Sequence, residues 1–271
     1  MADSGAEPPL STGPLCASLV GVSKLFGSFA ALRQVTMDLE PGRCYVLIGE
    51  NGAGKSTLLR ILAGLLRPSF GTVKVFGALE PHDERARIGY MSHAPMLYDE
   101  LTAQENLRYF SSLYPGRPNL TPAEALRQVG LDPDLTRTLG QYSQGMRQRT
   151  SLARVLLPVP ELLLLDEPFS NMDIESARQM VELLAGFRQG NRTIVITTHQ
   201  REMAAPIADW VLTLHAGRLA SFEPGSPATG LRRWGGEPGS PATGLRRWGG
   251  ESGSPATGLR RGGGEPGSPA L

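Results

Sequence analysis

The sequence predicts an α/β fold whose core is a parallel sheet covered by helices, and two segments carry most of this prediction. The first is the apolar run Cys44–Ile48, which is followed directly by the glycine-rich string GENGAGKST at 49–57. The second is Leu162–Glu167, in which four leucines precede two carboxylates. Short apolar runs of this kind are typical of strands that are buried on both faces of a parallel sheet. Because ligands of such sheets bind at the carboxyl ends of the strands, we expect the string and the carboxylates to lie at one edge.

The string at 49–57 fits the pattern G-x-x-x-x-G-K-[ST], which predicts a phosphate-binding loop and therefore a P-loop NTPase core of the RecA-like type. Its glycines let successive backbone N–H groups turn toward phosphates, because a Cβ there would block the curl. Lys55 is expected to reach the β- and γ-phosphates of ATP, and Ser56 to offer its hydroxyl to Mg²⁺ at the start of a helix. The expected nucleotide-binding residues of the loop are Gly49, Glu50, Asn51, Gly52, Ala53, Gly54, Lys55, Ser56 and Thr57.

The carboxylates at the end of the second run have different expected roles. Asp166 is expected to hold Mg²⁺ through water, and Glu167 to act as the general base that polarises the attacking water. Taken alone, the two acids could simply mark a polar turn at the end of a strand. The glycine-rich loop upstream favours the catalytic interpretation, which makes Lys55 and Glu167 candidate catalytic residues.

The string YSQGMRQR at 142–149 resembles the signature loop of the ATP-binding subunits of ABC transporters, whose usual form is LSGGQ. Ser143 and Gly145 keep the serine and the second glycine, whereas Tyr, Gln and Met replace the other three residues of the motif. The resemblance implies that Ser143 and Gly145 face a γ-phosphate from a helix N-terminus. It also implies a head-to-tail homodimer that encloses two ATP molecules, since one chain carries one phosphate loop and one signature loop.

Further elements of the family follow in order over residues 16–222. The resemblance implies that Phe26 stacks on adenine, that Asp173 is the aspartate of the D-loop, and that His199 is a switch histidine in contact with the γ-phosphate. Taken alone, Phe26 could be a core residue and His199 an ordinary histidine at the end of a strand. His93 stands where the family usually has a glutamine. An imidazole there can ligate Mg²⁺ through nitrogen or hold a water molecule, and it titrates near neutral pH.

Three short segments suggest a subfamily. His93 with Pro95, the segment Leu101–Leu107 and the segment Thr197–Gln200 resemble the ATP-binding subunits of haem exporters of cytochrome c biogenesis. This resemblance implies haem or a haem–chaperone complex as cargo and a separate membrane permease as partner. An ABC-2 type exporter of drugs, lipids or polysaccharide remains an alternative.

Two other classes of protein were also considered. A non-transport ABC ATPase normally carries two cassettes in one chain or a long coiled-coil insertion, and the sequence shows neither. A nucleotide-binding regulator without turnover is disfavoured because Glu167 is present.

Strand and helix signals divide the chain. An N-terminal β-rich, antiparallel lobe is expected, with strands near Ala17–Val22, Val35–Leu39, Cys44–Ile48 and Thr72–Phe76, and a hairpin at 209–220 closes the domain. Two helices are expected over 102–113 and 121–129, because each begins with a threonine and has a glutamate three residues later. We expect one ATPase domain at 15–222, after a flexible segment at 1–14. Within it, a helical signature subdomain at about 93–150 is expected to dock the permease.

Five apolar or aromatic residues of this helical subdomain are candidates for the permease contact, although such residues are more often part of the core. They are Met96, Leu97, Tyr98, Tyr109 and Phe110.

Composition limits the other possibilities. No run approaches the roughly 18 apolar residues that a membrane-spanning helix needs, and no secretory signal is recognisable. We therefore expect a cytoplasmic protein that is peripheral on the cytoplasmic face of the cell (inner) membrane. The net charge of +1 gives no indication of a nucleic-acid surface. Cys16 and Cys44 lie in apolar strand-like surroundings and are expected to be reduced core residues.

Residues 223–271 differ from the rest of the chain. Near copies of the unit GSPATGLRRWGGEP begin at Gly225, Gly239 and Gly253, and the glycine- and proline-rich composition predicts disorder. The Arg-Arg-Trp strings at 232–234 and 246–248 could contact anionic lipid. A tandem duplication without function is the simpler interpretation.

Overall fold

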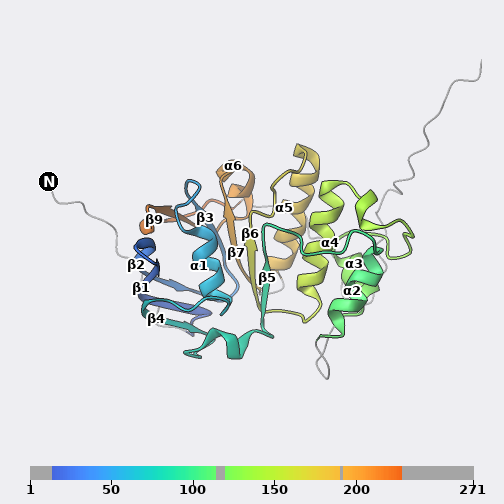
Figure 1. The fold of residues 1–271 in the computed structure, drawn as a ribbon. Coiled ribbons are helices and arrows are strands. Elements are labelled where there is room, and N and C mark those ends of the chain that lie inside the picture. Colours follow the sequence, from blue (N-terminus) through green and yellow to red (C-terminus); the bar gives the residue numbers. More distant parts are fainter. Residues whose placement is uncertain (1–13, 114–119, 190–191, 228–271) are drawn as a thin grey trace, which may run out of the picture. The chain divides into compact units, whose positions relative to one another are not determined.

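The structure is a computed structural model that describes residues 14–113, 120–189 and 192–227 (Figure 1). Residues 1–13 of the expected flexible segment at 1–14 and nearly all of the repeat tail lie outside these ranges. The strands are β1 (Ala17–Phe26), β2 (Phe29–Leu39), β3 (Cys44–Ile48), β4 (Phe70–Val75), β5 (Ile88–Met91), β6 (Leu162–Asp166), β7 (Thr193–Thr198), β8 (Trp210–His215) and β9 (Arg218–Pro224). The helices are α1 (Lys55–Leu62), α2 (Ala103–Ser111), α3 (Pro122–Gln128), α4 (Gln144–Leu156), α5 (Ile174–Gln189) and α6 (Arg201–Ala204).

The strands form two sheets. A six-stranded sheet has the order β5-β6-β7-β3-β8-β9, in which only the β8–β9 pair is antiparallel. A three-stranded antiparallel sheet has the order β2-β1-β4. This arrangement confirms the expected α/β fold with an antiparallel lobe. It also places β3 and β6, which precede the glycine-rich loop and end in the carboxylates, in one parallel sheet.

Alternate residues of the central strands face two separate cores, as the two-residue period of a strand requires. On β3, Cys44 and Val46 pack with residues of α2 to α6, whereas Tyr45 and Leu47 pack with α1 and the three-stranded sheet. The four leucines of β6 divide in the same way between the two cores. A strand covered on both faces must be apolar throughout, which explains the uninterrupted runs in the sequence.

The two cysteines behave as expected. Cys16 and Cys44 are free and buried. Burial raises the pKa of the Cys16 thiol to about 11 and that of the Cys44 thiol to about 12, so both remain protonated at neutral pH.

The two predicted capping boxes are present. Thr102 caps α2 and Thr121 caps α3, and in each case the glutamate three residues later accepts hydrogen bonds from the threonine N–H and hydroxyl. These bonds lower the pKa of the Glu105 and Glu124 carboxyls.

Several boundaries differ from the expected ones. Strand β2 begins at Phe29 rather than near Val35, because a tight turn at residues 27–28 lets the chain pair with β1 at once. Strand β9 continues to Pro224, two residues beyond the expected end of the domain at 222. No helix within the described ranges is long and apolar enough to cross a membrane.

Candidate nucleotide-binding site

A cavity of about 700 Å³ lies at the edge of the sheet where β3 and β6 end on either side of β7. It brings together most of the residues that the sequence singled out, from the antiparallel lobe, the glycine-rich loop and the end of β6. The residues that line it are Phe26, Phe29, Ala31, Glu50, Asn51, Gly52, Gly54, Lys55, Ser56, Thr57, His93, Asp166, Glu167, Ser170 and His199.

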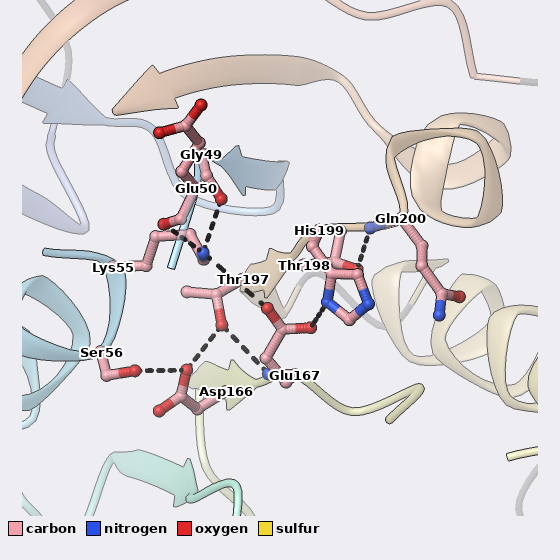
Figure 2. Close-up of polar contacts among 10 residues, drawn as sticks. All are labelled: Gly49, Glu50, Lys55, Ser56, Asp166, Glu167, Thr197, Thr198, His199 and Gln200. Carbon is pink, nitrogen blue, oxygen red and sulfur yellow. Dashed lines mark hydrogen bonds and ion pairs between the residues drawn. The ribbon is translucent and has the colours of Figure 1, made fainter. Parts of the chain in front are cut away.

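The glycine-rich loop has the geometry of a phosphate cradle. Gly54 caps α1 with φ 105°, a left-handed conformation, and a Cβ there would lie 2.5 Å from the carbonyl oxygen of Ala31. Only glycine satisfies both constraints. Lys55 is 7% exposed, and its ammonium group donates to the carbonyl oxygens of Gly49 at 2.7 Å and Glu50 at 3.1 Å (Figure 2). A buried cation beside the free N–H groups of a helix start is a suitable site for an anionic phosphate.

The two carboxylates have different surroundings. Asp166 is 2% exposed, and its Oδ1 accepts hydrogen bonds from the hydroxyls of Ser56 at 3.0 Å and Thr197 at 2.7 Å (Figure 2). Glu167 lies 3.0 Å from Nδ1 of His199 and 3.9 Å from the ammonium nitrogen of Lys55. A buried carboxylate that receives two hydroxyl groups fits a divalent cation, because Mg²⁺ prefers oxygen ligands and few of them from protein.

Thr197 connects the Asp166 carboxylate to the backbone of Glu167, and sequence reasoning missed it. Its hydroxyl donates to Asp166 and accepts from the backbone N–H of Glu167 at 3.0 Å, and its carbonyl accepts from the same N–H at 3.1 Å. Glu167 has φ 54°, which is uncommon for a residue with a side chain. The hydrogen bonds from Thr197 therefore hold the catalytic candidate in a strained backbone conformation. Its one sequence signal is the position of Thr197 two residues before His199 at the end of an apolar strand.

Two further predicted residues, His93 and Phe26, lie in the cavity. His93 follows β5 and is exposed, within the same cavity as Ser56 and Asp166. Phe26 is 49% exposed at the end of β1, so it is not a core residue. Phe29 is 60% exposed and also lines the cavity. It was not predicted, although a second aromatic residue only three positions after Phe26 was a signal that could have been used.

Ser143, Gly145 and Asp173 are not among the described residues that line this cavity. Ser176 lies against two of them, Asp173 and Gly145. Asp173 accepts hydrogen bonds from the N–H of Ser176 at 2.8 Å and from its hydroxyl at 2.7 Å, which lowers the pKa of the Asp173 carboxyl. A Cβ on Gly145 would lie 2.9 Å from the Ser176 hydroxyl oxygen, so the glycine permits this close approach. Ser143 is exposed and caps α4.

The segment after His93 is bound to the same helix, α4. Arg147 donates to the carboxylate of Asp99 at 2.6 Å, and the hydroxyl of Ser151 donates to the carbonyl of Pro95 at 3.2 Å.

The five residues that are candidates for the permease contact are at least partly exposed. Tyr98 and Tyr109 pack edge to face with ring centroids 5.4 Å apart, and Phe110 packs on Tyr109 at 5.3 Å. Tyr98, Tyr109 and Met96 are exposed, whereas Leu97 and Phe110 are only partly buried against the core.

A phosphate cradle that faces two carboxylates at the edge of a parallel sheet defines a P-loop nucleoside-triphosphatase. The family model for ABC transporters matches residues 32–170. The chain therefore belongs to the ATP-binding subunits of ABC transporters, and it is an ATP-binding transport ATPase, as the signature loop and the motif order predicted.

Relatives of several kinds match this chain. A fluoroquinolones export ATP-binding protein of Mycobacterium tuberculosis (strain ATCC 25618 / H37Rv) is 38% identical over 197 residues, which are 71% of this chain and 65% of that protein. The cytochrome c biogenesis ATP-binding export protein CcmA of Xanthomonas oryzae pv. oryzae (strain MAFF 311018) is 35% identical over 179 residues, or 66% of this chain and 84% of that protein. Among solved structures, a dimeric ATP-binding cassette in a post-hydrolysis state with ADP and phosphate superimposes with a TM-score of 0.69 at 26% identity. It covers 77% of this chain and 98% of its own.

Proposed function

We propose that this chain is the ATP-hydrolysing subunit of an exporter that serves haem export in cytochrome c biogenesis. It acts as a homodimer beneath a separate membrane permease, on the cytoplasmic face of the inner membrane. One observation carries the hydrolytic part of the proposal. Glu167 lies at the edge of the cavity within reach of His199 and Lys55, and directly after the buried Asp166.

The residues of the cavity that the sequence predicted have distinct roles in this proposal. The glycine-rich loop and Lys55 bind the phosphates of ATP, and Phe26 stacks on the base. Ser56, Asp166 and His93 hold Mg²⁺, which supplies charge compensation for the phosphates when it is bound. Glu167 accepts a proton from the attacking water. His199 contacts the γ-phosphate and, through its Nδ1, orients the Glu167 carboxylate.

The homodimer follows from the separation of the two groups of residues. Gly145 and Asp173 lie beside Ser176, Ser143 caps α4, and none of the three is among the described residues that line the cavity with Lys55 and Glu167 in the same chain. A second copy, placed head to tail, would bring its signature loop to the γ-phosphate of the first. The dimeric cassette of similar fold supports this arrangement.

The haem cargo rests on sequence resemblance. His93 with Pro95 and the segments Leu101–Leu107 and Thr197–Gln200 resemble haem-exporter subunits, and CcmA is among the similar proteins. An ABC-2 type exporter of drugs, lipids or polysaccharide is the second candidate, favoured by the similarity to the fluoroquinolones export protein. Co-purification of the tagged chain with haem-handling membrane proteins supports the first candidate, and co-purification with an unrelated permease supports the second.

The hydrolytic proposal is tested by Glu167→Gln in the full-length chain, with Glu182→Gln on the exposed face of α5 as the matched control. We expect the first variant to lose about 10²- to 10⁴-fold in Mg-ATP turnover, because it lacks the general base. It should also accumulate an ATP-bound dimer in size-exclusion chromatography. The control should behave as wild type. Equal turnover in the two variants, or no ATP-dependent dimer in either, would refute the proposal.

A further inference from the structure

Two exposed phenylalanines face each other at the end of the β1–β2 hairpin. Phe26 and Phe29 are cross-strand partners, separated by only the turn residues Gly27 and Ser28. Gly27 has φ 59°, the conformation that tight hairpin turns require and that glycine adopts without strain. Side chains of directly opposed residues in an antiparallel pair lie on the same face of the sheet, with Cβ atoms about 5 Å apart. The turn therefore presents both rings on one side.

That side is the nucleotide cavity. Both rings line it together with Ala31. Phe26 is 49% exposed to solvent and Phe29 is 60% exposed. Lys24 is not among the described residues that line the cavity, and its ammonium group lies over the Phe26 ring at 5.3 Å from the centroid. The same ammonium group is fixed by a 2.8 Å hydrogen bond to the carbonyl of Arg67. The Phe26 ring thus has one fixed cationic neighbour outside the cavity lining, and it stays about half exposed.

We propose that Phe29 is a positioning residue for the nucleobase, and that it forms with Phe26 an aromatic platform on which the base stacks. The inference rests on the proposed function of the cavity and adds a second ring to the single stacking residue that the family resemblance implies. The three cavity residues of this hairpin, Phe26, Phe29 and Ala31, carry no hydrogen-bonding side chain. Every base has a π-face, so a platform of this kind holds adenine and guanine with similar strength.

The test measures the affinity of the full-length chain for ATP, GTP and inorganic tripolyphosphate by calorimetry. The variants are Phe29→Ala, Phe29→Leu and Phe29→Tyr. Phe70→Ala is the matched control, because Phe70 is a 64% exposed phenylalanine on β4 of the same sheet that does not line the cavity. Tripolyphosphate reports on the glycine-rich loop alone, because it has no base.

We expect Phe29→Ala to weaken ATP and GTP binding by the same factor, about five- to twentyfold, the lower part of the range for loss of one stacking ring because Phe29 stays partly in solvent. Phe29→Leu should fall between alanine and wild type. Phe29→Tyr and Phe70→Ala should bind as wild type, and tripolyphosphate affinity should be unchanged throughout.

Three results overturn the inference. Unchanged ATP affinity in Phe29→Ala, with or without a weaker dimer, would show that the Phe29 ring does not stack on the base. An equal loss for tripolyphosphate would show a structural effect on the loop. Equal losses of ATP affinity in Phe29→Ala and Phe70→Ala would show that the effect does not depend on the place of Phe29 in the cavity lining. The proposed function fails separately, when wild type binds no nucleotide or when Glu167→Gln keeps full turnover.

Discussion

Thr197→Val is the most informative single change for the architecture of this site. Valine has nearly the shape of threonine, so the substitution removes the hydroxyl and leaves the packing of β7 intact. Thr197 is fully buried, and its hydroxyl donates to Oδ1 of Asp166 at 2.7 Å and accepts from the N–H of Glu167 at 3.0 Å. The variant therefore loses one hydrogen bond to a buried charge and one neutral hydrogen bond.

The two losses are unequal. A hydrogen bond to a charged group contributes about 1.5–3 kcal/mol, and Asp166 would keep only the Ser56 hydroxyl as a donor among the hydrogen bonds described for it. The N–H of Glu167 keeps the carbonyl of Thr197 at 3.1 Å, so the second loss adds little. We expect the free energy of unfolding to fall by about 2–3 kcal/mol, and the melting temperature by about 5–10 °C for a domain of this size.

Thr193→Val is the matched control. Thr193 is also buried on β7, but the partners of its hydroxyl are uncharged: it accepts from the backbone N–H of Gly42 at 3.0 Å and contacts the Cys16 thiol, so its loss should cost about 1 kcal/mol. Urea unfolding of both variants, with unchanged slopes, gives the comparison. Equal destabilisation by the two substitutions would refute the reasoning that Thr197 supports a buried charge. Mg-ATP turnover should fall in Thr197→Val only.

Two further substitutions test separate contacts. Arg87 holds Glu161 through bonds of 2.7 and 2.9 Å, which lowers the pKa of the Glu161 carboxyl. A lowered carboxyl pKa gives stability that is present above the ordinary glutamate pKa and is lost as pH falls through the lowered value. Glu161→Gln should therefore cost roughly 0.5 kcal/mol at pH 7, because the pair is exposed, and progressively less in urea unfolding as pH falls below the ordinary glutamate pKa; a constant difference across pH would contradict this. Gly145→Ala places a Cβ 2.9 Å from the Ser176 hydroxyl oxygen, and it should lower the free energy of unfolding by about 1–3 kcal/mol, partly restored by Ser176→Ala; a neutral single variant would show that the contact relaxes freely.

The sequence predicts those parts of the fold in which a local pattern has one physical cause. The runs at 44–48 and 162–165 are apolar throughout because helices or a second sheet cover both faces of β3 and β6. The phosphate loop is predicted because its glycines and Lys55 stand at fixed spacing. The caps of α2 and α3 are predicted because a capping box lies within four consecutive residues. Each of these predictions depends on neighbours in sequence.

Residues missed by sequence reasoning act through neighbours in space. Thr197 reaches Asp166 because β6 and β7 are adjacent parallel strands and these two residues are register partners. The order of strands in a doubly covered sheet is not contained in any local pattern, so this pair could not be predicted from either segment alone. Phe29 lines the cavity because the β1–β2 turn contains only residues 27 and 28. A longer turn, as the expected start of β2 near Val35 implied, would have left its direction undefined.

The strain at Glu167 connects the stability of the fold to the chemistry of the site. A residue with a side chain in the left-handed region costs about 1–3 kcal/mol, and it persists only when surrounding bonds fix it. Here the Glu167 N–H is bound by both oxygens of Thr197, and its carbonyl accepts from the N–H of Ser170 at 3.1 Å. The same turn brings the carboxylate to His199 and Lys55. Loss of the Thr197 hydroxyl therefore weakens the bonds that oppose the strain, and we expect the Glu167 carboxylate to become disordered before the sheet unfolds.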